Sequence, residues 1–306
     1  MPFTAYVMIA LVAALVAAYA YWRLRYGPPA AGSIPILTYH KVDGRFELGG
    51  TRVTPAQFAR QMRWLKDAGY TAVTLSRAAE LMRSGNAAGK KCICLTFDDA
   101  YESLYTNVWP VLRECGFVAT VFALSDFVGA ENTWDINWLG LRFRHLDWEQ
   151  MKQMQAAGIE FGSHGASHRD LRFLSDEQLA SEVAGSKQAL ERDLGATVTA
   201  FCYPFGRYDE HVTAAVKKAG YDAACSLAPN LRNDQTDFFA LRRCGVYITD
   251  TLWDLRCKVD QRSDWFWIED LFTRCVNCCA GGTALVKRLA ARRTAPDNRD
   301  QGACRS

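Results

Sequence analysis

The sequence predicts an α/β fold: a distorted (β/α) barrel of seven or eight strands, preceded by a transmembrane helix. Strand-like and helix-like stretches alternate from Ile34 onward, and this alternation is typical of parallel sheets. About eight such units follow one another, which favours a closed or nearly closed barrel. Before them, Phe3–Trp22 is a run of twenty uncharged residues, long enough to cross a hydrocarbon layer of ~30 Å as a helix.

The composition agrees with a single barrel domain. A chain of 306 residues has room for two domains, yet one α/β barrel fills the same length. Hydrophobic residues make up 49% of the chain, which is ample for a core, and the formal net charge is +3. A charge this small gives no basis for a nucleic-acid partner.

The N-terminal segment, residues 1–26, is predicted to be an uncleaved membrane anchor. The alternative is a signal peptide cleaved near Ala18-Tyr19-Ala20, but the basic region that precedes the apolar part of such peptides is missing. Arg23 and Arg25 follow the apolar run, so the positive-inside rule favours a cytoplasmic position for the rest of the chain. We expect an inner-membrane protein of a bacterium, with a linker at 27–33.

The cysteines bear on the compartment. There are eleven, an odd number, and Cys92 and Cys94 lie in an apolar run where free thiols pack as small hydrophobic groups. This favours a reducing compartment. The cluster "CVNCC", Cys275–Cys279, leaves a zinc site as an alternative, but no second Cys/His pair follows at finger spacing, so free thiols are favoured.

The predicted elements follow in order along the chain. The strands are short apolar runs bounded by turn residues, at 34–39, 71–75, 92–97, 117–124, 159–163, 199–204, 222–226 and 239–248. The helices show apolar residues at helical spacing, at 55–70, 76–85, 108–115, 147–158, 175–195 and 211–219. The long helix begins with Ser175-x-x-Gln178, a pattern typical of helix starts.

These elements define one domain at 34–258 and an extension at 259–306 that is expected to be partly disordered. The basic stretch "VKRLAARR" near the end of the chain has two interpretations. It either rests on an anionic membrane surface or is a solvated tail, and the tail is favoured.

Reactive residues of such barrels stand at the carboxyl ends of the strands. Five residues occupy such positions: His40, Asp98, Asp99, His164 and Pro204. The adjacent carboxylates also fit the plainer function of capping the next helix. The pair His164 and His168 is spaced so that two imidazoles and one carboxylate can bind zinc with one position left open, which is typical of a hydrolytic site. Taken alone, such a pair is more often incidental.

Three motifs, "TFDD", "SHGASH" and "FCYPFG", stand in this order and resemble the first three motifs of the polysaccharide deacetylases, the NodB-homology group of carbohydrate esterase family four. The resemblance extends from about Ile34 to about Val246 and includes "LTYHKV" near its start. Three ordered motifs make it specific.

The resemblance implies a metal-dependent hydrolase that removes an N-acetyl group from an amino sugar. Asp99, His164 and His168 would hold a divalent metal, with zinc expected and cobalt, nickel or iron as alternatives. Asp98 would act as general base on the attacking water, and a backbone N–H at Phe205 would help bind the oxyanion. The expected partners are the membrane and a substrate that is an amino-sugar polysaccharide or a lipid-linked glycan. A carbohydrate O-acetyl esterase and a catalytically silent sugar-binding membrane protein remain alternatives.

The sequence departs from the family pattern at three places. Cys202 stands where the family has an arginine that steadies the catalytic aspartate, so Arg242 or Arg243 is needed instead, and we expect Arg243. Ala100 replaces the glycine that ends the first motif, which predicts a modest backbone adjustment.

The third departure concerns the late general-acid histidine, because no histidine follows His211. His40 is the candidate replacement, since the first strand lies beside the last in a closed barrel; its alternative is a hydrogen-bonded strand-end residue. His145 and His211 are expected on the surface. Trp134 and Trp138 either stack on a sugar ring or pack their loop onto the core.

Overall fold

The computed structural model of the chain describes residues 3–47, 50–135, 140–228, 230–232, 235–261 and 263–278. All strand pairs in its sheet are parallel. The strands are β1 (Ile36–Tyr39), β2 (Thr71–Val73), β3 (Cys92–Phe97), β4 (Thr120–Ala123), β5 (Glu160–Ser163), β6 (Ala200–Cys202), β7 (Ala223–Ser226), β8 (Leu241–Arg242) and β9 (Cys244–Gly245). Each lies within a predicted strand segment.

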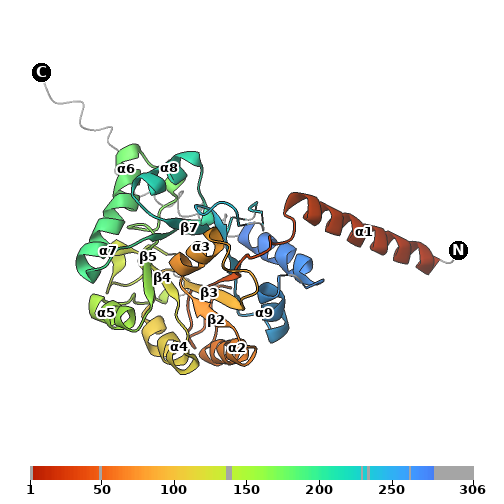
Figure 1. Cartoon of the computed structure of the whole chain (residues 1–306), viewed down its shortest axis with the longest axis horizontal. Coiled ribbons are helices and arrows are strands. Elements are labelled where there is room, and N and C mark those ends of the chain that lie inside the picture. The colour runs from red at the N-terminus through yellow and green to blue at the C-terminus, as the bar shows by residue number, and fades with distance from the viewer. Residues whose placement is uncertain are drawn as a thin grey trace, which may run out of the picture.

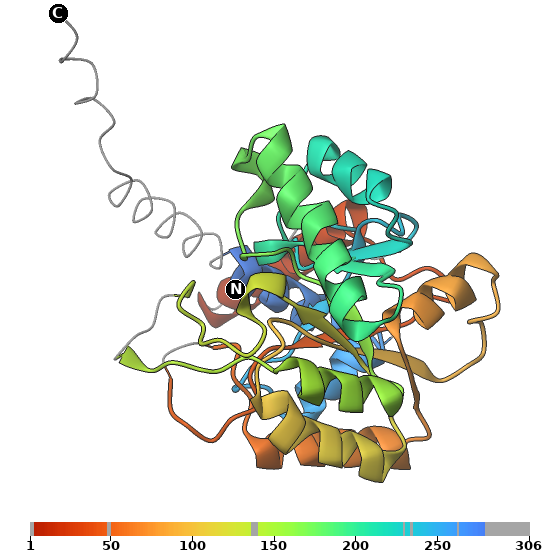
Figure 2. The same cartoon turned by 90° about the vertical axis from the view of Figure 1, so that its left-hand side faces the viewer.

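Helices surround the strands, as the views in Figures 1 and 2 show. They are α1 (Phe3–Arg25), α2 (Pro55–Asp67), α3 (Leu75–Arg83), α4 (Trp109–Cys115), α5 (Trp148–Ala156), α6 (Asp176–Ala180), α7 (Ser186–Leu194), α8 (Glu210–Lys218) and α9 (Leu252–Val259). Short helical segments lie between them: η1 (Leu104–Val108), η2 (Ser125–Phe127), η4 (Leu171–Phe173), η5 (Ser181–Gly185) and η6 (Pro204–Gly206).

Local signals in the sequence explain where these helices begin and end. The predicted start at Ser175 is confirmed, because its side chain accepts the Gln178 N–H while the Gln178 side chain accepts the Ser175 N–H. The side chain of Thr54 caps α2 in the simpler way, by accepting the Gln57 N–H. Helix α4 ends at Gly116, whose φ of 70° lies in the left-handed region that glycine enters without steric cost.

The predicted barrel is confirmed, and one bent segment closes it. The strand order is β8-β7-β6-β5-β4-β3-β1-β9, with β2 paired to the start of β3. Strands β8 and β9 are separated only by Arg243, yet β8 pairs with β7 and β9 pairs with β1. The single run 241–245 therefore bridges the two edges of the sheet, and the first strand lies beside the last as predicted.

Side chains alternate between the inside and the outside of the barrel. Along β3, Cys94 packs with the interior cluster, whereas Ile93 and Leu95 pack with the cluster beneath the outer helices. Leu75 and Ala78 of α3 belong to the interior cluster, and Figure 1 shows α3 across the middle of the barrel. One end of the interior is thus apolar and covered, which leaves the polar residues for the carboxyl ends of the strands.

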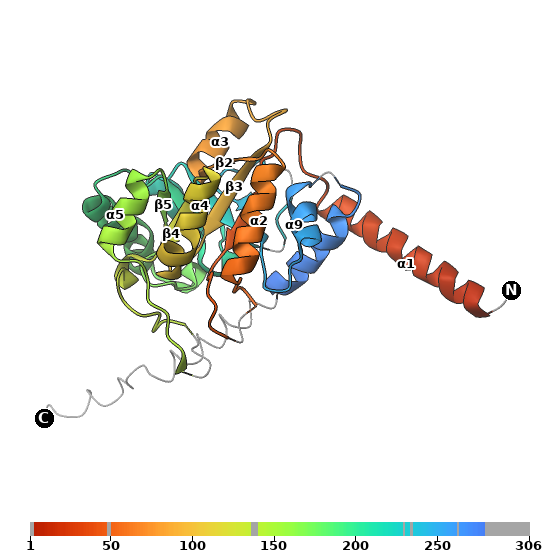
Figure 3. The same cartoon turned by 90° about the horizontal axis from the view of Figure 1, so that it is seen from below.

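Helix α1 projects away from the barrel (Figures 1 and 3). In the described part of the chain, only the stretch Tyr6–Arg25 is long and apolar enough to span a membrane, and its side chains are almost all exposed. Such a helix suits either a membrane anchor or a signal sequence.

The predicted C-terminal extension, 259–306, begins as part of the packed body of the molecule. Its residues 266–278 form a helix, on which Glu269, Asp270 and Arg274 are buried charged residues. Asp270 pairs with Arg242 and Glu269 pairs with Lys258, while Arg274 pairs with Asp270 of the same helix and donates to the Leu231 carbonyl, so this helix packs on the domain. The predicted basic tail "VKRLAARR" lies outside the described residues.

The described cysteines are free, and most of them are buried; they are Cys92, Cys94, Cys115, Cys202, Cys225, Cys244, Cys257, Cys275 and Cys278. Cys275 and Cys278 are exposed. This matches the packing of thiols as small hydrophobic groups that the sequence predicts.

Candidate active site

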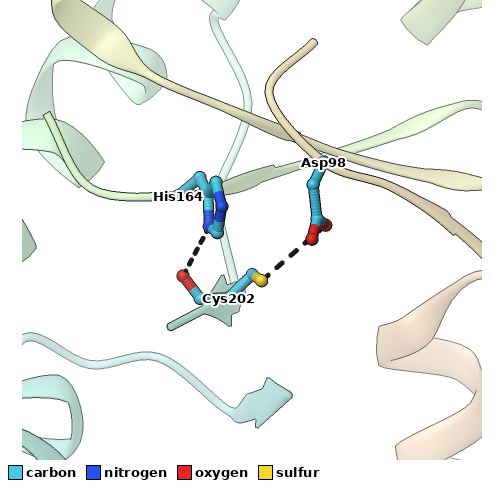
Figure 4. A group of neighbouring side chains, drawn as sticks. All are labelled: Asp98, His164 and Cys202. Carbon is cyan, nitrogen blue, oxygen red and sulfur yellow. Dashed lines mark hydrogen bonds between the residues drawn. The ribbon is translucent and has the colours of Figure 1, made fainter. Parts of the chain in front are cut away.

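The candidate residues come from five points around the barrel and meet at the carboxyl ends of its strands. His40 follows β1, Asp98 and Asp99 follow β3, and His164 follows β5. Cys202 ends β6, and Arg243 lies between β8 and β9. Figure 4 shows the side chains of Asp98, His164 and Cys202 turned toward one another.

Asp98 is held by the predicted Arg243. The guanidinium donates from Nη1 to Oδ1 at 2.7 Å and from Nη2 to Oδ2 at 2.8 Å, and both residues are buried. Burial alone would raise the pKa of Asp98, but the charge and hydrogen bonds of Arg243 outweigh it and hold that pKa well below its usual range. Asp98 is therefore ionised, with its carboxylate fixed in one orientation.

Cys202 completes the surroundings of this ion pair. Its Sγ lies 3.0 Å from Arg243 Nη2 and 3.7 Å from Asp98 Oδ1. Burial raises the pKa of Cys202 well above its usual value, so it is a neutral thiol. The arginine of the family pattern is thus replaced by an arginine on a different strand, with a small side chain leaving room for it.

A left-handed turn lets the two adjacent carboxylates reach one site. Asp98 continues the inward row of Cys94 and Thr96, and the backbone then turns with φ values of 68° at Asp99 and 54° at Ala100. Ala100 thus adopts a left-handed conformation that favours glycine. Hydrogen bonds hold this turn, including one from the Leu146 N–H to the Ala100 carbonyl at 2.8 Å.

Asp99, His164 and His168 converge. Asp99 Oδ1 lies 3.8 Å from His164 Nε2 and 3.7 Å from His168 Nε2. The ligand atoms of the three residues lie within 4.8 Å of one another. A carboxylate and two imidazoles at such separations fit a small divalent cation with bonds of about 2.0–2.2 Å.

The hydrogen bond of His164 favours this fit. Its Nδ1 lies 2.8 Å from the Cys202 carbonyl oxygen, which only accepts, so Nδ1 carries the proton and Nε2 presents its lone pair toward Asp99. Burial lowers the pKa of His164, although Asp98 opposes the shift. The ring is therefore neutral, as a metal ligand must be.

A second group, Asp98, His164 and Cys202, also has its donor atoms within 4.8 Å of one another. It fits a cation less well, because both Asp98 oxygens accept from Arg243 and the positive guanidinium lies 3.0 Å from Cys202 Sγ. The group around Asp99 is the better candidate.

Glu182 holds the loop between the two histidines and was not singled out from the sequence. It lies in η5, is buried, and accepts the Ala166 N–H at 2.8 Å and the Ser167 N–H at 2.9 Å. The Ser167 hydroxyl also donates to it. A glutamate within an amphipathic helix gives no sequence signal for this task, since most such residues face water.

His40 lies beside Asp98, with Nε2 3.8 Å from Oδ2, and its side chain is 22% exposed. Burial of the ring lowers the pKa of His40 to about 4, against the opposing effect of Asp98. His40 is therefore neutral near pH 7. To act as an acid it must first receive a proton within the site.

Phe205 has a φ of 58° within η6, and its ring lies 4.5 Å from that of His168, centre to centre. The next residue must be glycine, because a Cβ on Gly206 would lie 2.9 Å from the Leu227 nitrogen. The motif thus forms a tight turn whose backbone borders the candidate metal ligands.

The expectation that His145 lies on the surface is wrong. It is buried, its Nδ1 donates to the Asp99 carbonyl at 2.6 Å, and its Nε2 accepts from Trp134 at 3.2 Å. Trp134 in turn lies over the His168 ring at 4.1 Å. The tryptophan loop therefore packs onto the site through His145, while Trp138 lies outside the described residues. His211 is exposed as expected.

The barrel and this arrangement of residues define a class of hydrolase. The family model "Polysaccharide deacetylase" matches residues 85–224. A Bacillus subtilis protein, YxkH, which is provisionally named a polysaccharide deacetylase, is 32% identical over 213 residues, covering 70% of this chain and 71% of the relative. The chain belongs to the polysaccharide deacetylase family. Its named relatives indicate a hydrolase that acts on the carbon–nitrogen bonds of acetylated sugars.

Two further relatives place the chain within the family. The poly-β-1,6-N-acetyl-D-glucosamine N-deacetylase of Staphylococcus epidermidis is 25% identical over 235 residues, 74% of this chain and 77% of that protein. The structure of the Streptococcus pyogenes deacetylase PplD in complex with acetate matches with a TM-score of 0.66 at 23% identity, over 74% of this chain and 98% of that one. The second likeness shows the shared fold.

Proposed function

We propose that this protein hydrolyses the N-acetyl group of a hexosamine in a polymer of the poly-β-1,6-N-acetylglucosamine kind and is held in the membrane by α1. The observation that carries the proposal is the convergence of Asp99, His164 and His168 beside an aspartate fixed by Arg243. The similarity to a named poly-β-1,6-N-acetylglucosamine deacetylase supports the substrate class. A lipid-linked glycan with the same sugar would present the same amide.

Asp99, His164 and His168 would hold the divalent metal, for which their donor atoms suit zinc. When bound, the ion supplies a Lewis acid for the acetyl carbonyl and lowers the pKa of a coordinated water toward ~7. His164 enters the reaction as a neutral ligand because its Nδ1 proton is engaged by the Cys202 carbonyl.

Asp98 would accept the proton of the attacking water. Since Arg243 stabilises its anionic form, Asp98 is a weak base and keeps the proton only briefly. His40 lies 3.8 Å away and is neutral at rest, so it can receive that proton and deliver it to the nitrogen as the C–N bond breaks. The products are acetate and the free amine, and the Phe205 N–H would bind the oxyanion formed on the way.

The test is acetate release by the detergent-purified full chain. β-1,6-linked N-acetylglucosamine oligomers should yield acetate, chelation should abolish this, and added zinc should restore it. His164→Ala should lose both metal and turnover. His40→Ala should lower turnover while metal stays bound, and loss of both would contradict its function as an acid.

Two other results would overturn the proposal. Acetate from an O-acetylated sugar but not from the amide would make the protein an esterase. Bound metal without acetate from either substrate would make it a sugar-binding protein.

The anchor is the second part of the proposal. Trp22 Nε1 donates to Asp270 at 2.7 Å, and the Arg274 guanidinium lies 3.7 Å from the centre of the Tyr26 ring. These contacts make the end of α1 part of the packed body, which supports a retained helix over a cleaved signal sequence. Alkaline extraction of membranes should leave the full chain in the pellet, and release into the supernatant would contradict the anchor.

The cytoplasmic position expected from Arg23 and Arg25 is also part of the proposal. An impermeant thiol reagent should label Cys304 only after the cell membrane is opened. Labelling of intact cells would place the catalytic domain outside.

A further inference from the structure

Apart from Phe266, the buried residues of the helix over 266–278 are polar, and its most exposed large side chains are apolar. The residues buried against the domain include Glu269, Asp270, Thr273 and Arg274. Its exposed side carries Trp265 just before the helix, Ile268 and Phe272, which are 57%, 39% and 52% exposed. This is the reverse of the usual surface helix, whose apolar stripe faces the core.

The buried charges explain why the helix is held in this orientation. Asp270 accepts from Arg242 of β8, from Arg274 at 3.1 Å and from Trp22 of α1 at 2.7 Å. Glu269 lies 3.1 Å from Lys258 of α9. With its polar side tied to three elements, the helix presents the opposite side outward.

The helix over 266–278 packs against the domain end of α1 through aromatic pairs, of which Phe266 and Trp22 are buried. Trp267 meets Tyr19 edge to face, with ring centres 5.6 Å apart, and Phe266 meets Trp22 at 6.2 Å. On the other side, Trp265 meets Trp253 of α9 at 6.3 Å, and Trp253 is itself 48% exposed. Figures 1 and 3 show this helix, in blue, directly beside the domain end of α1.

We propose that Trp253, Trp265, Ile268 and Phe272 form a membrane-contact face that lies in the head-group region of the bilayer next to α1. Tyr19 and Tyr21 lie exposed near the end of α1, followed by Arg23 and Arg25, an order typical of the membrane–water boundary. The helix over 266–278 packs at that level of α1. Its exposed aromatic and aliphatic side chains are therefore placed to contact lipid, as in amphipathic helices that lie in the membrane–water interface.

Such a face fixes how the domain sits on the bilayer. A single anchor helix alone leaves the domain free to tilt and rotate. A second contact beside the anchor restrains both motions, so the catalytic end of the barrel keeps a constant orientation to the membrane. The inference rests on α1 spanning the bilayer, and not on the chemistry of the site.

The test uses the full chain in vesicles that contain phosphatidylcholine brominated near the top of the acyl chains, which quenches nearby tryptophans. Trp265→Phe keeps the face apolar but removes one reporter, so the quenched part of the emission should fall. The matched control is Trp148→Phe, at the start of α5 on the side of the barrel away from α1 (Figure 1). It should leave the quenched part unchanged.

A second variant tests the contact itself. Ile268→Glu should reduce the quenching of Trp265, while its thermal unfolding and its turnover of soluble oligomers stay as in the parent. Equal losses for Trp265→Phe and Trp148→Phe, or none for Trp265→Phe, would overturn the proposal.

Two further outcomes would do the same. Cross-linking of two chains through the exposed Cys275, without quenching of Trp265, would show that a second copy covers the face. Failure of the full chain to float with vesicles would remove the anchor, whereas flotation without quenching would remove only the membrane-contact face.

Discussion

Arg242 and Arg243 are adjacent, both are buried, and each pairs with a carboxylate, but they serve opposite sides of the barrel. Arg243 points inward to Asp98 at the candidate active site. Arg242 points outward to Asp270 on the helix over 266–278. Successive side chains of a strand face opposite ways. A shift of one residue in register therefore separates the arginine that orients Asp98, the candidate catalytic carboxylate, from the arginine that attaches the C-terminal helix.

The two ion pairs differ in their surroundings. Inside, one guanidinium meets one carboxylate through two parallel hydrogen bonds, a geometry that fixes orientation. Outside, Arg242 and Arg274 share Asp270, and burial together with the charge of Arg242 lowers the pKa of Arg274 to about 10. The Arg243–Asp98 pair therefore fixes the orientation of one carboxylate. The pairs around Asp270 attach the C-terminal helix to the domain.

The largest expected effect is that of Arg243→Ala. Asp98 would lose both hydrogen bonds that orient it and would no longer be stabilised as an anion. We expect turnover of oligomers to fall by about 10²–10⁴-fold, the range of a general base, with metal content unchanged. Turnover equal to that of the parent would contradict the positioning function of Arg243.

Removing one partner of a buried ion pair costs about 3–5 kcal/mol, so Arg243→Ala could lose activity by unfolding. A compensating variant distinguishes this from a loss of positioning. In the double variant Arg243→Ala, Cys202→Arg, the guanidinium returns on β6, where the family pattern carries it. Partial recovery of turnover is expected, because Cys202 Sγ lies only 3.7 Å from Asp98 Oδ1. Recovery of stability without turnover would show that the pair is purely structural.

Glu182→Gln is expected to have the next largest effect. It tests whether the buried Glu182 supports the candidate metal ligands through the loop between His164 and His168, or only the packing of that loop. The amide keeps the size of the side chain but loses the charge that accepts from Ala166, Ser167 and the Ser167 hydroxyl. Looser histidine ligands should lower the metal affinity by about 10–100-fold. Competition with a coloured chelator measures this, and an unchanged affinity would assign Glu182 to packing.

Arg242→Ala should lower the free energy of unfolding without changing turnover. Asp270 keeps Arg274 and Trp22 as partners, so the free energy of unfolding should fall by about 1.5–3 kcal/mol, the worth of a hydrogen bond to a charged group. Turnover of soluble oligomers should be unchanged. The rate of amide hydrogen exchange should rise over 266–278 and stay unchanged over 92–99. A rise over 92–99 alone would contradict the assignment of Arg242 to the C-terminal helix and of Arg243 to Asp98.

The comparison also shows what the sequence could and could not predict. The strands are apolar runs ended by turn residues, so local patterns locate all of them and place Asp98, Asp99 and His164 at strand ends. Arg242 and Arg243 were both candidates because only the register of 241–245 decides which one faces inward. That register depends on pairing with β7 and β1, which no local pattern contains.

The residues that sequence reasoning missed act through contacts distant along the chain. His145 follows the charged stretch "RFR", which suggests a surface position, yet it bonds to the Asp99 carbonyl 46 residues earlier. The helix over 266–278 was not predicted, and its buried polar side is explained only by Arg242 and Lys258, which lie on β8 and α9. Polar and charged residues are mostly exposed, so their burial here could not be foreseen from local sequence.

The smallest expected effect is that of Ala100→Gly, beside the inner pair. A left-handed alanine costs about 1–2 kcal/mol, which glycine would relieve. Against this, glycine gives up a buried methyl worth about 0.8 kcal/mol and adds about 0.4–1 kcal/mol of unfolded-state freedom. The terms nearly cancel, so denaturant unfolding should shift by less than ~1 kcal/mol. A much larger gain would mean that the turn holding Asp99 is strained in this chain, and that the site tolerates alanine only at the expense of stability.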